Sequence, residues 1–135
     1  MQNNESFYPK DWFRIGAKEL KRAEQLLNLE DLEGAGFNIQ QAVEKYLKGY
    51  LVFKGWKLRR VHDLDVLLNE VVVYEPSFEE FRQKCQKITE YYIEERYPFV
   101  LASEFTEEEI KDSLQIVKKM VDRILRLTGS IDDQK

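Results

Sequence analysis

The most unusual cluster of reactive side chains in this sequence is the run Arg96-Tyr97-Pro98, which closely follows Tyr91 and Tyr92. A proline disfavours helical backbone at the residue before it, so a helix carrying these tyrosines should end near Tyr97. An arginine at such a helix end can form two parallel hydrogen bonds to a phosphate or a carboxylate. The alternative is structural: Arg96 pairs with neighbouring glutamates while the tyrosines pack.

The single histidine, His62, stands where a loop is expected to become a helix, directly before Asp63. A histidine beside a carboxylate can act as a general base or donate a hydrogen bond to phosphate. It can equally be a structural or capping residue. The one cysteine, Cys85, falls on an apolar stripe and is expected in the core, so we expect no metal site and no cofactor.

Charge is strongly segregated in the middle of the chain. Residues 45–62 contain six basic side chains and no acid, whereas residues 63–81 contain six acids and no base. The basic side chains are Lys45, Lys48, Lys54, Lys57, Arg59 and Arg60. Tyr46, Tyr50, Phe53 and Trp56 are interleaved with them. Cations attract phosphates and aromatic rings stack on bases, so this mixture suits a nucleotide or a single strand. Solvated lysines beside a buried aromatic face are the alternative.

A polar stripe precedes and overlaps this basic segment. Asn38, Gln41, Lys45 and Lys48 follow one another at spacings of three and four residues, which places them on one side of a helix. The amide groups in the stripe suit the edge of a base and a buried contact between helices equally well.

Composition limits the class of protein that can position these groups. The chain has 135 residues, of which 43% are hydrophobic, and a net charge of −4, which argues against a uniformly basic nucleic-acid coat. We expect a single domain over 1–135, with a core from about 11 to 128 and flexible ends. The sequence shows neither a membrane-spanning apolar run nor a signal-peptide pattern, so we expect a cytoplasmic protein.

The apolar spacing predicts an all-α fold, an up-and-down bundle of four long helices and one short helix. Long helices are expected over about 11–28 and 35–54, the second ending at Gly55, and a short helix should follow Asp63 as its cap. Ser77 with Glu80, and Thr106 with Glu109, have the spacing of capping boxes and should begin the last two helices. The run 71–73 alone would suit a strand, but no second strand is evident.

The last helix has an unusually wide apolar face. Its main stripe is Ile110, Leu114, Val117, Val121 and Ile124. Ile116, Met120 and Leu127 lie beside that stripe. The wide face indicates either a central helix of the bundle or a surface for a partner, and we expect a homodimer.

Three blocks of this sequence, in this order, resemble the HEPN domain (higher eukaryotes and prokaryotes nucleotide-binding). The block 38–48, with its Gln-Gln-Ala-Val-Glu-Lys core, is similar to the central helix of that family. His62-Asp63-Leu64 resembles the opening of its short helix, and Arg96-Tyr97-Pro98 the end of its fourth helix. Trp12, at the start of the first helix, also fits, and the likeness extends over roughly 11–128.

The resemblance implies a helical bundle, often homodimeric, of a branch encoded beside a minimal nucleotidyltransferase in toxin–antitoxin pairs. Many HEPN proteins are metal-independent ribonucleases that use an arginine followed a few residues later by a histidine. Here Leu101, Ala102 and Ser103 stand where that histidine would be, and no histidine follows Arg96.

We therefore expect a module that binds a nucleotide or RNA. Its candidate site residues are Gln41, Lys45, Lys48, Arg59, Arg60, His62, Arg96 and Tyr97. The alternatives are a ribonuclease that uses Arg96 and His62, and a bundle that only binds other proteins.

Overall fold

The computed structural model describes residues 8–57, 60–96 and 105–129, and for 93–96 it describes the backbone alone. The described elements are α1 (Pro9–Asn28), α2 (Leu32–Phe53), α3 (Leu64–Tyr74), the 3₁₀ turn η1 (Pro76–Phe81), α4 (Arg82–Arg96) and α5 (Glu107–Leu127). Over these ranges the chain is all-α, with four long helices, one short helix and no strand, which confirms the predicted fold class. Of the chain ends that were expected to be flexible, residues 1–7 and 130–135 lie outside the described residues, whereas Pro9 and Lys10 belong to α1.

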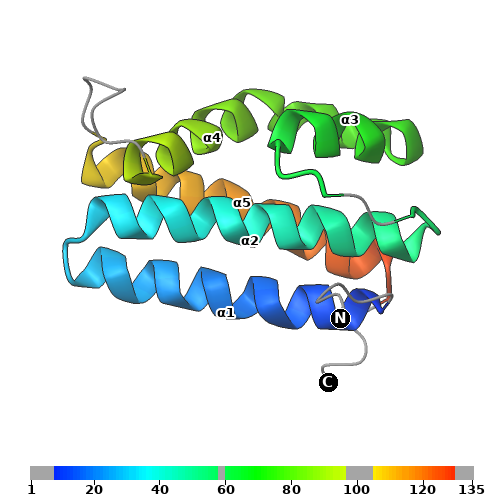
Figure 1. Cartoon of the computed structure of the whole chain (residues 1–135), viewed down its shortest axis with the longest axis horizontal. Helices are drawn as coiled ribbons and strands as arrows, with labels where there is room; N and C mark the ends of the chain where they lie inside the picture. The colour runs from blue at the N-terminus through cyan, green and yellow to red at the C-terminus, as the bar shows by residue number, and fades with distance from the viewer. Residues whose placement is uncertain (1–7, 58–59, 97–104, 130–135) are drawn as a thin grey trace.

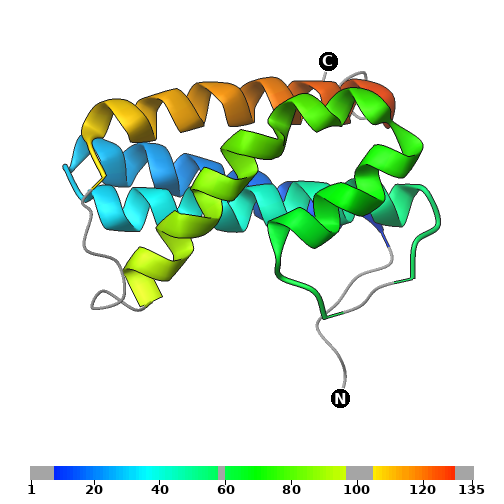
Figure 2. The same cartoon turned by 90° about the horizontal axis from the view of Figure 1, so that it is seen from above.

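Helix α2 is the centre of the bundle, because it packs against α1, α3, α4 and α5. Helices α1 and α2 lie side by side in opposite directions, as Figure 1 shows. Helix α4 crosses obliquely over the bundle, and α3 lies beside the second half of α2 (Figure 2). The close approach of α1 to α2 requires small residues, since a Cβ added at Gly49 would lie 2.5 Å from the ring of Phe13.

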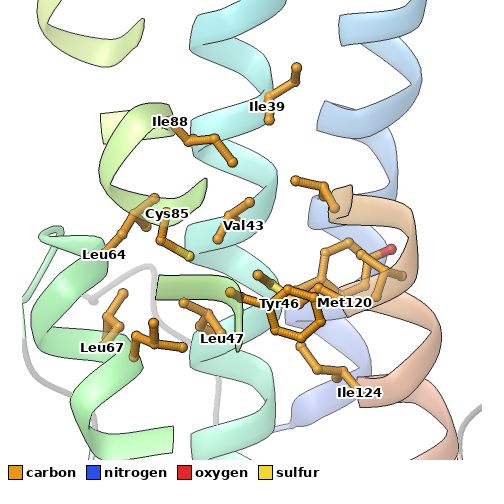
Figure 3. Packing of buried hydrophobic residues seen from close by; sticks show 14 of the residues in the cluster. Ile39, Val43, Tyr46, Leu47, Leu64, Leu67, Cys85, Ile88, Met120 and Ile124 are labelled. Atoms are coloured by element: carbon orange, nitrogen blue, oxygen red, sulfur yellow. The ribbon is translucent and has the colours of Figure 1, made fainter. Parts of the chain in front are cut away.

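The core is built around the apolar face of α2. Figure 3 shows Ile39, Val43 and Leu47 of α2 facing side chains from α3, α4 and α5. Cys85 of α4 is completely buried among them, as predicted, and burial raises the pKa of its thiol to about 12. The thiol therefore stays protonated at neutral pH and cannot serve as a nucleophile in the folded protein.

Two helix starts follow their predicted caps. The Asp63 carboxylate accepts hydrogen bonds from the backbone N–H of Asp65 (2.8 Å) and of Val66 (3.4 Å) at the start of α3. Thr106 and Glu109 form a complete capping box, with each side chain accepting from the backbone N–H of the other residue. Both caps are confirmed.

Helix α2 begins three residues earlier than its apolar pattern predicted, at Leu32 rather than near residue 35. The Asp31 carboxylate accepts from the backbone N–H of Gly34 at 2.9 Å and so caps the helix there. The far end agrees better with prediction: α2 ends at Phe53, and Gly55 follows with a φ of 87°.

The predicted cap at Ser77 is wrong. Ser77 lies inside η1, for which Glu75 is the cap residue, and its hydroxyl donates to the Glu75 carboxylate at 3.0 Å. Pro76 occupies the first position of η1, where the N–H that proline lacks would have no partner within the turn. A 3₁₀ turn therefore precedes α4, which begins at Arg82. The strand-like run 71–73 is helical.

The wide apolar face of α5 is largely used within the chain. Its main stripe is buried, and Met120 beside that stripe is completely buried as well. Ile116 packs against the core, while Leu127 is 41% exposed. The homodimer stays a prediction.

Candidate functional site

A buried ion pair lies in the middle of α2. The Nζ atom of Lys48 lies 3.0 Å from Oε2 of Glu44, and the two side chains are 3% and 4% exposed. Lys48 also lies 5.6 Å from the centroid of the Trp12 ring, where a cation and a ring attract each other. Charges taken out of water are costly unless they are paired, so each of these two buried side chains needs the other.

The same Glu44 oxygen holds the only histidine. Nδ1 of His62 lies 2.8 Å from Oε2 of Glu44, although the His62 side chain is 70% exposed. A carboxylate accepts hydrogen bonds, so Nδ1 carries the proton and Nε2 faces away from Glu44. His62 is therefore a surface ring with a fixed orientation, anchored to a buried charge.

The capped start of α3 follows His62 directly in the chain. His62 directly precedes Asp63, whose carboxylate caps α3. The next acid, Asp65, accepts from Arg82 and from Gln86, each at 3.3 Å. The two carboxylates that follow His62 in sequence are thus engaged by their own partners.

The predicted polar stripe of α2 divides into separate contacts. The amide of Asn38 donates to the backbone oxygen of Gly34 in its own helix at 2.9 Å. Lys45 donates to Gln41 at 3.3 Å, and Gln41 donates to the buried Gln40 at 2.6 Å. Lys45 and Gln41 therefore remain half-buried and linked one turn before the Glu44–Lys48 pair.

The candidate site residues fall into different environments. Arg60 and His62 are exposed, Gln41 and Lys45 are half-buried, and Lys48 is buried against Glu44. Arg59 and Tyr97 lie outside the described residues. Arg96 ends α4, and its side chain also lies outside what the structure describes.

The described backbone does not bring Arg96 beside His62 within one chain. The start of α3 contacts the first half of α4, where Gln86 donates to Asp65. Arg96 lies ten residues beyond Gln86, which corresponds to about 15 Å along the helix axis. In Figure 2 the start of α3 lies apart from the end of α4.

Glu44, which anchors the site, is not among the residues that the sequence predicts for it. A signal was present, because Glu44 and Lys48 are four residues apart and the residues around them, Val43 and Leu47, are apolar. A charged pair at that spacing on a buried face indicates an internal ion pair. The contact with His62, eighteen positions away in sequence, depends on the return of the chain from α2 to α3.

The part of the chain that the structure describes contains neither a candidate metal site nor a candidate membrane span. No group of three or more histidine, cysteine, aspartate or glutamate side chains is placed to hold a metal ion there. None of the described helices has a stretch long and apolar enough to cross a bilayer.

Comparison with known proteins gives one match. Residues 9–127 match the family model described as the HEPN domain. Neither a curated protein nor a solved structure matches the chain significantly.

Proposed function

Because the chain belongs to the HEPN domain family, we propose that it is a helical module that binds a nucleotide or RNA. We further propose that it acts with a minimal nucleotidyltransferase in a toxin–antitoxin-type pair, as a homodimer. The first proposal rests on the His62 site, and the second on the resemblance of the three sequence blocks.

One observation carries the binding proposal: an exposed imidazole is held in place by a buried carboxylate, within a segment rich in lysine and arginine. A ring fixed through Nδ1 keeps Nε2 oriented toward solvent, so it loses less rotational freedom when it binds a ligand. When both ring nitrogens carry a proton, Nε2 donates to a phosphate oxygen, and a hydrogen bond between charged groups is stronger than a neutral one.

The remaining candidate residues add positive charge and amide groups around this ring. Arg60 is exposed two residues before His62, and Lys45 lies on the turn of α2 next to Glu44. In this proposal Lys48 acts indirectly, by balancing the charge of Glu44. Arg59, Arg96 and Tyr97 remain proposed phosphate ligands on the strength of the sequence.

Titration of AMP and a short single-stranded RNA tests this proposal, with wild type compared with His62→Ala. We expect His62→Ala to weaken binding at least tenfold, because a hydrogen bond to a charged group contributes about 1.5 to 3 kcal/mol. Lys18→Ala is the matched control, since Lys18 is an exposed cation on α1. If wild type binds neither ligand, or if the two variants behave alike, His62 is not a phosphate ligand.

A ribonuclease is the second candidate function, and the contact between Glu44 and His62 favours it. A carboxylate that holds Nδ1 leaves Nε2 as the acceptor that a general base needs. The distance of the Arg96 backbone from α3 means that Arg96 would have to come from a second copy of the chain. Incubation of RNA with wild type and with Glu44→Gln tests this candidate, and intact RNA with both proteins would eliminate it.

A further inference from the structure

One end of the bundle exposes aromatic rings where α2 and α3 finish. Phe53, the last residue of α2, is 44% exposed, and Tyr74, the last residue of α3, is 42% exposed. Val73 beside them is 77% exposed. Of the four aromatic residues in the basic segment, Tyr46 and Tyr50 are buried in the core, and Trp56 is half-buried against it. The structure thus leaves Phe53 accessible and brings Tyr74, from the acidic segment, close to it. Both rings lie next to one lysine.

That cation is Lys54. Its Nζ atom lies 5.7 Å from the ring centroid of Tyr74 and 6.0 Å from those of Phe53 and Tyr50. Tyr50, only 2% exposed, forms the floor of the group, and its ring stacks on the buried Phe78 at 5.9 Å. The Lys54 ammonium group therefore lies near one ring of the core as well as near the two exposed rings.

Burial, with a further contribution from the nearby Glu75, raises the pKa of Tyr50. The Tyr50 phenol therefore stays neutral. Glu75 is an acid at the border of this surface, and its carboxylate accepts from the hydroxyl of Ser77. The chain that leaves the surface towards His62 is basic: Lys57 and Arg60 are exposed, and residues 54–62 contain no acid.

We propose that Phe53 and Tyr74 form a base-stacking platform for single-stranded RNA, whose phosphates are bound by Lys54, Lys57, Arg60 and His62. This inference rests on the proposed function and names its ligand as an oligonucleotide rather than a mononucleotide. Aromatic side chains beside a basic track are the features by which proteins hold single strands without reading their sequence.

The spacing of the two subsites supports an oligonucleotide. Glu44, which holds His62, and Phe53 lie nine residues apart on α2, which is about 14 Å along the helix axis and half a turn around it, so a ligand that reaches both places must pass around the end of the helix. A strand of several nucleotides can place a base on the platform and a phosphate at His62 together. The exposed cations Lys57 and Arg60 belong to the segment that joins the two places. A protein partner whose surface carries charges of both signs would be attracted less strongly by this run of cations than a chain of phosphates.

The test compares two ligands, AMP and a hexamer of adenylate, on the full chain. Phe53→Leu/Tyr74→Leu keeps apolar bulk but removes both π faces, and we expect it to weaken hexamer binding about tenfold or more. Binding of AMP, which reaches only the His62 subsite, should change less than twofold. Phe53→Tyr, which keeps a ring, should retain hexamer affinity, and Val73→Leu is the control for an exposed apolar neighbour.

A spectroscopic readout separates stacking from general loss of affinity. The fluorescence of a 2-aminopurine base within the hexamer should fall on binding to wild type, because the base stacks on a ring. The fall should be absent with the double leucine variant at a saturating protein concentration. Unchanged far-ultraviolet circular dichroism and melting temperature show that the variant is folded. Were the double variant unfolded, the two single leucine variants would be measured in its place.

The outcomes distinguish this inference from the proposed function. If AMP and the hexamer bind with equal affinity, or if the leucine variants bind the hexamer as wild type does, the platform is wrong while the His62 site stands. If neither ligand binds wild type, both proposals fail. If the leucine variants change the mass in light scattering and leave hexamer binding intact, the surface is a protein interface and the inference is overturned.

Discussion

The acidic segment 63–81 and the basic segment 45–62 carry opposite charges of equal size, yet the fold uses them differently. The acids are largely consumed by contacts within the chain: Asp65 and Glu79 bind Arg82, and Glu80 binds Arg123 and Lys119. These pairs join α3, η1, α4 and α5. The acidic segment therefore has a structural role that its composition alone does not reveal.

The basic segment makes fewer contacts of this kind. Lys48 is paired with buried Glu44, and Lys54 lies against aromatic rings, whereas Lys57 and Arg60 are exposed. Among described residues, neither Lys57 nor Arg60 forms an ion pair. Equal and opposite charge in sequence thus becomes one surface that is internally neutralised and one that remains able to attract an anion.

The largest effect should come from the buried pair that anchors the basic segment. Glu44→Ala leaves the Lys48 ammonium buried without its partner, so we expect a loss of about 3 to 5 kcal/mol in the free energy of unfolding. Urea denaturation measures this loss. The double variant Glu44→Gln/Lys48→Met, which removes both charges, should recover most of it. A loss below about 1 kcal/mol for Glu44→Ala would mean that water reaches this pair.

Variants of Arg82 and Lys57 should separate the roles of the acidic and basic segments. Arg82→Ala breaks contacts with Glu79 and Asp65 and should lower the free energy of unfolding by about 1 kcal/mol while nucleotide affinity is unchanged. Lys57→Ala should do the reverse, weakening binding and its dependence on salt while stability stays within about 0.5 kcal/mol. Parallel denaturation and binding curves for both variants measure these opposite effects. If both variants change stability, or both change nucleotide affinity, the two segments do not have separate roles.

Low pH should reduce the contribution of the acidic segment to the free energy of unfolding, by a smaller amount than the substitutions above. Hydrogen bonds from Arg82 lower the pKa of Glu79, and those from Arg123 and Lys119 lower the pKa of Glu80. A carboxylate with a lower pKa in the folded state contributes stability above its unfolded pKa and loses it as the pH falls through the folded value. Urea denaturation at decreasing pH should therefore show a decline that is shallower for Glu79→Gln/Glu80→Gln.

The smallest effect concerns Ser77, which begins no helix. Ser77→Ala should change the free energy of unfolding by less than about 0.5 kcal/mol, whereas Thr106→Ala should cost about 1 kcal/mol because it removes a true cap. Thermal melts of the two variants measure the difference. Equal destabilisation would indicate that the contacts of Ser77 with Glu75 and Arg123 matter as much as a cap.

The helices could be predicted because periodicity and capping are local properties. Thr106 and Asp63 each satisfy backbone groups within three residues, so short stretches of sequence contain the complete signal. Ser77 has the same local pattern, but Pro76 at the start of η1 moves the cap to Glu75. A pattern that a 3₁₀ turn and an α-helix share cannot distinguish them.

The candidate site was predicted less completely, because its geometry is set by contacts between distant segments. His62 was identified from its type and neighbour, but its anchor is Glu44, on another helix. Lys48 was expected on a binding surface, and its burial depends on the packing of Trp12 at the start of α1. Which aromatic rings remain accessible likewise depends on where α3 ends, which brings Tyr74 to Lys54.

The burial of Cys85 provides a chemical probe of how often the core of the protein opens. It is the only cysteine in the sequence, it is fully buried between α2, α3 and α4, and its thiol stays protonated in the folded state. A thiol reagent can therefore modify the protein only when these helices separate, so the labelling rate reports how often the core opens. Ligands that bind the folded chain should slow this labelling in proportion to their occupancy, which provides a binding assay that needs no label on the ligand.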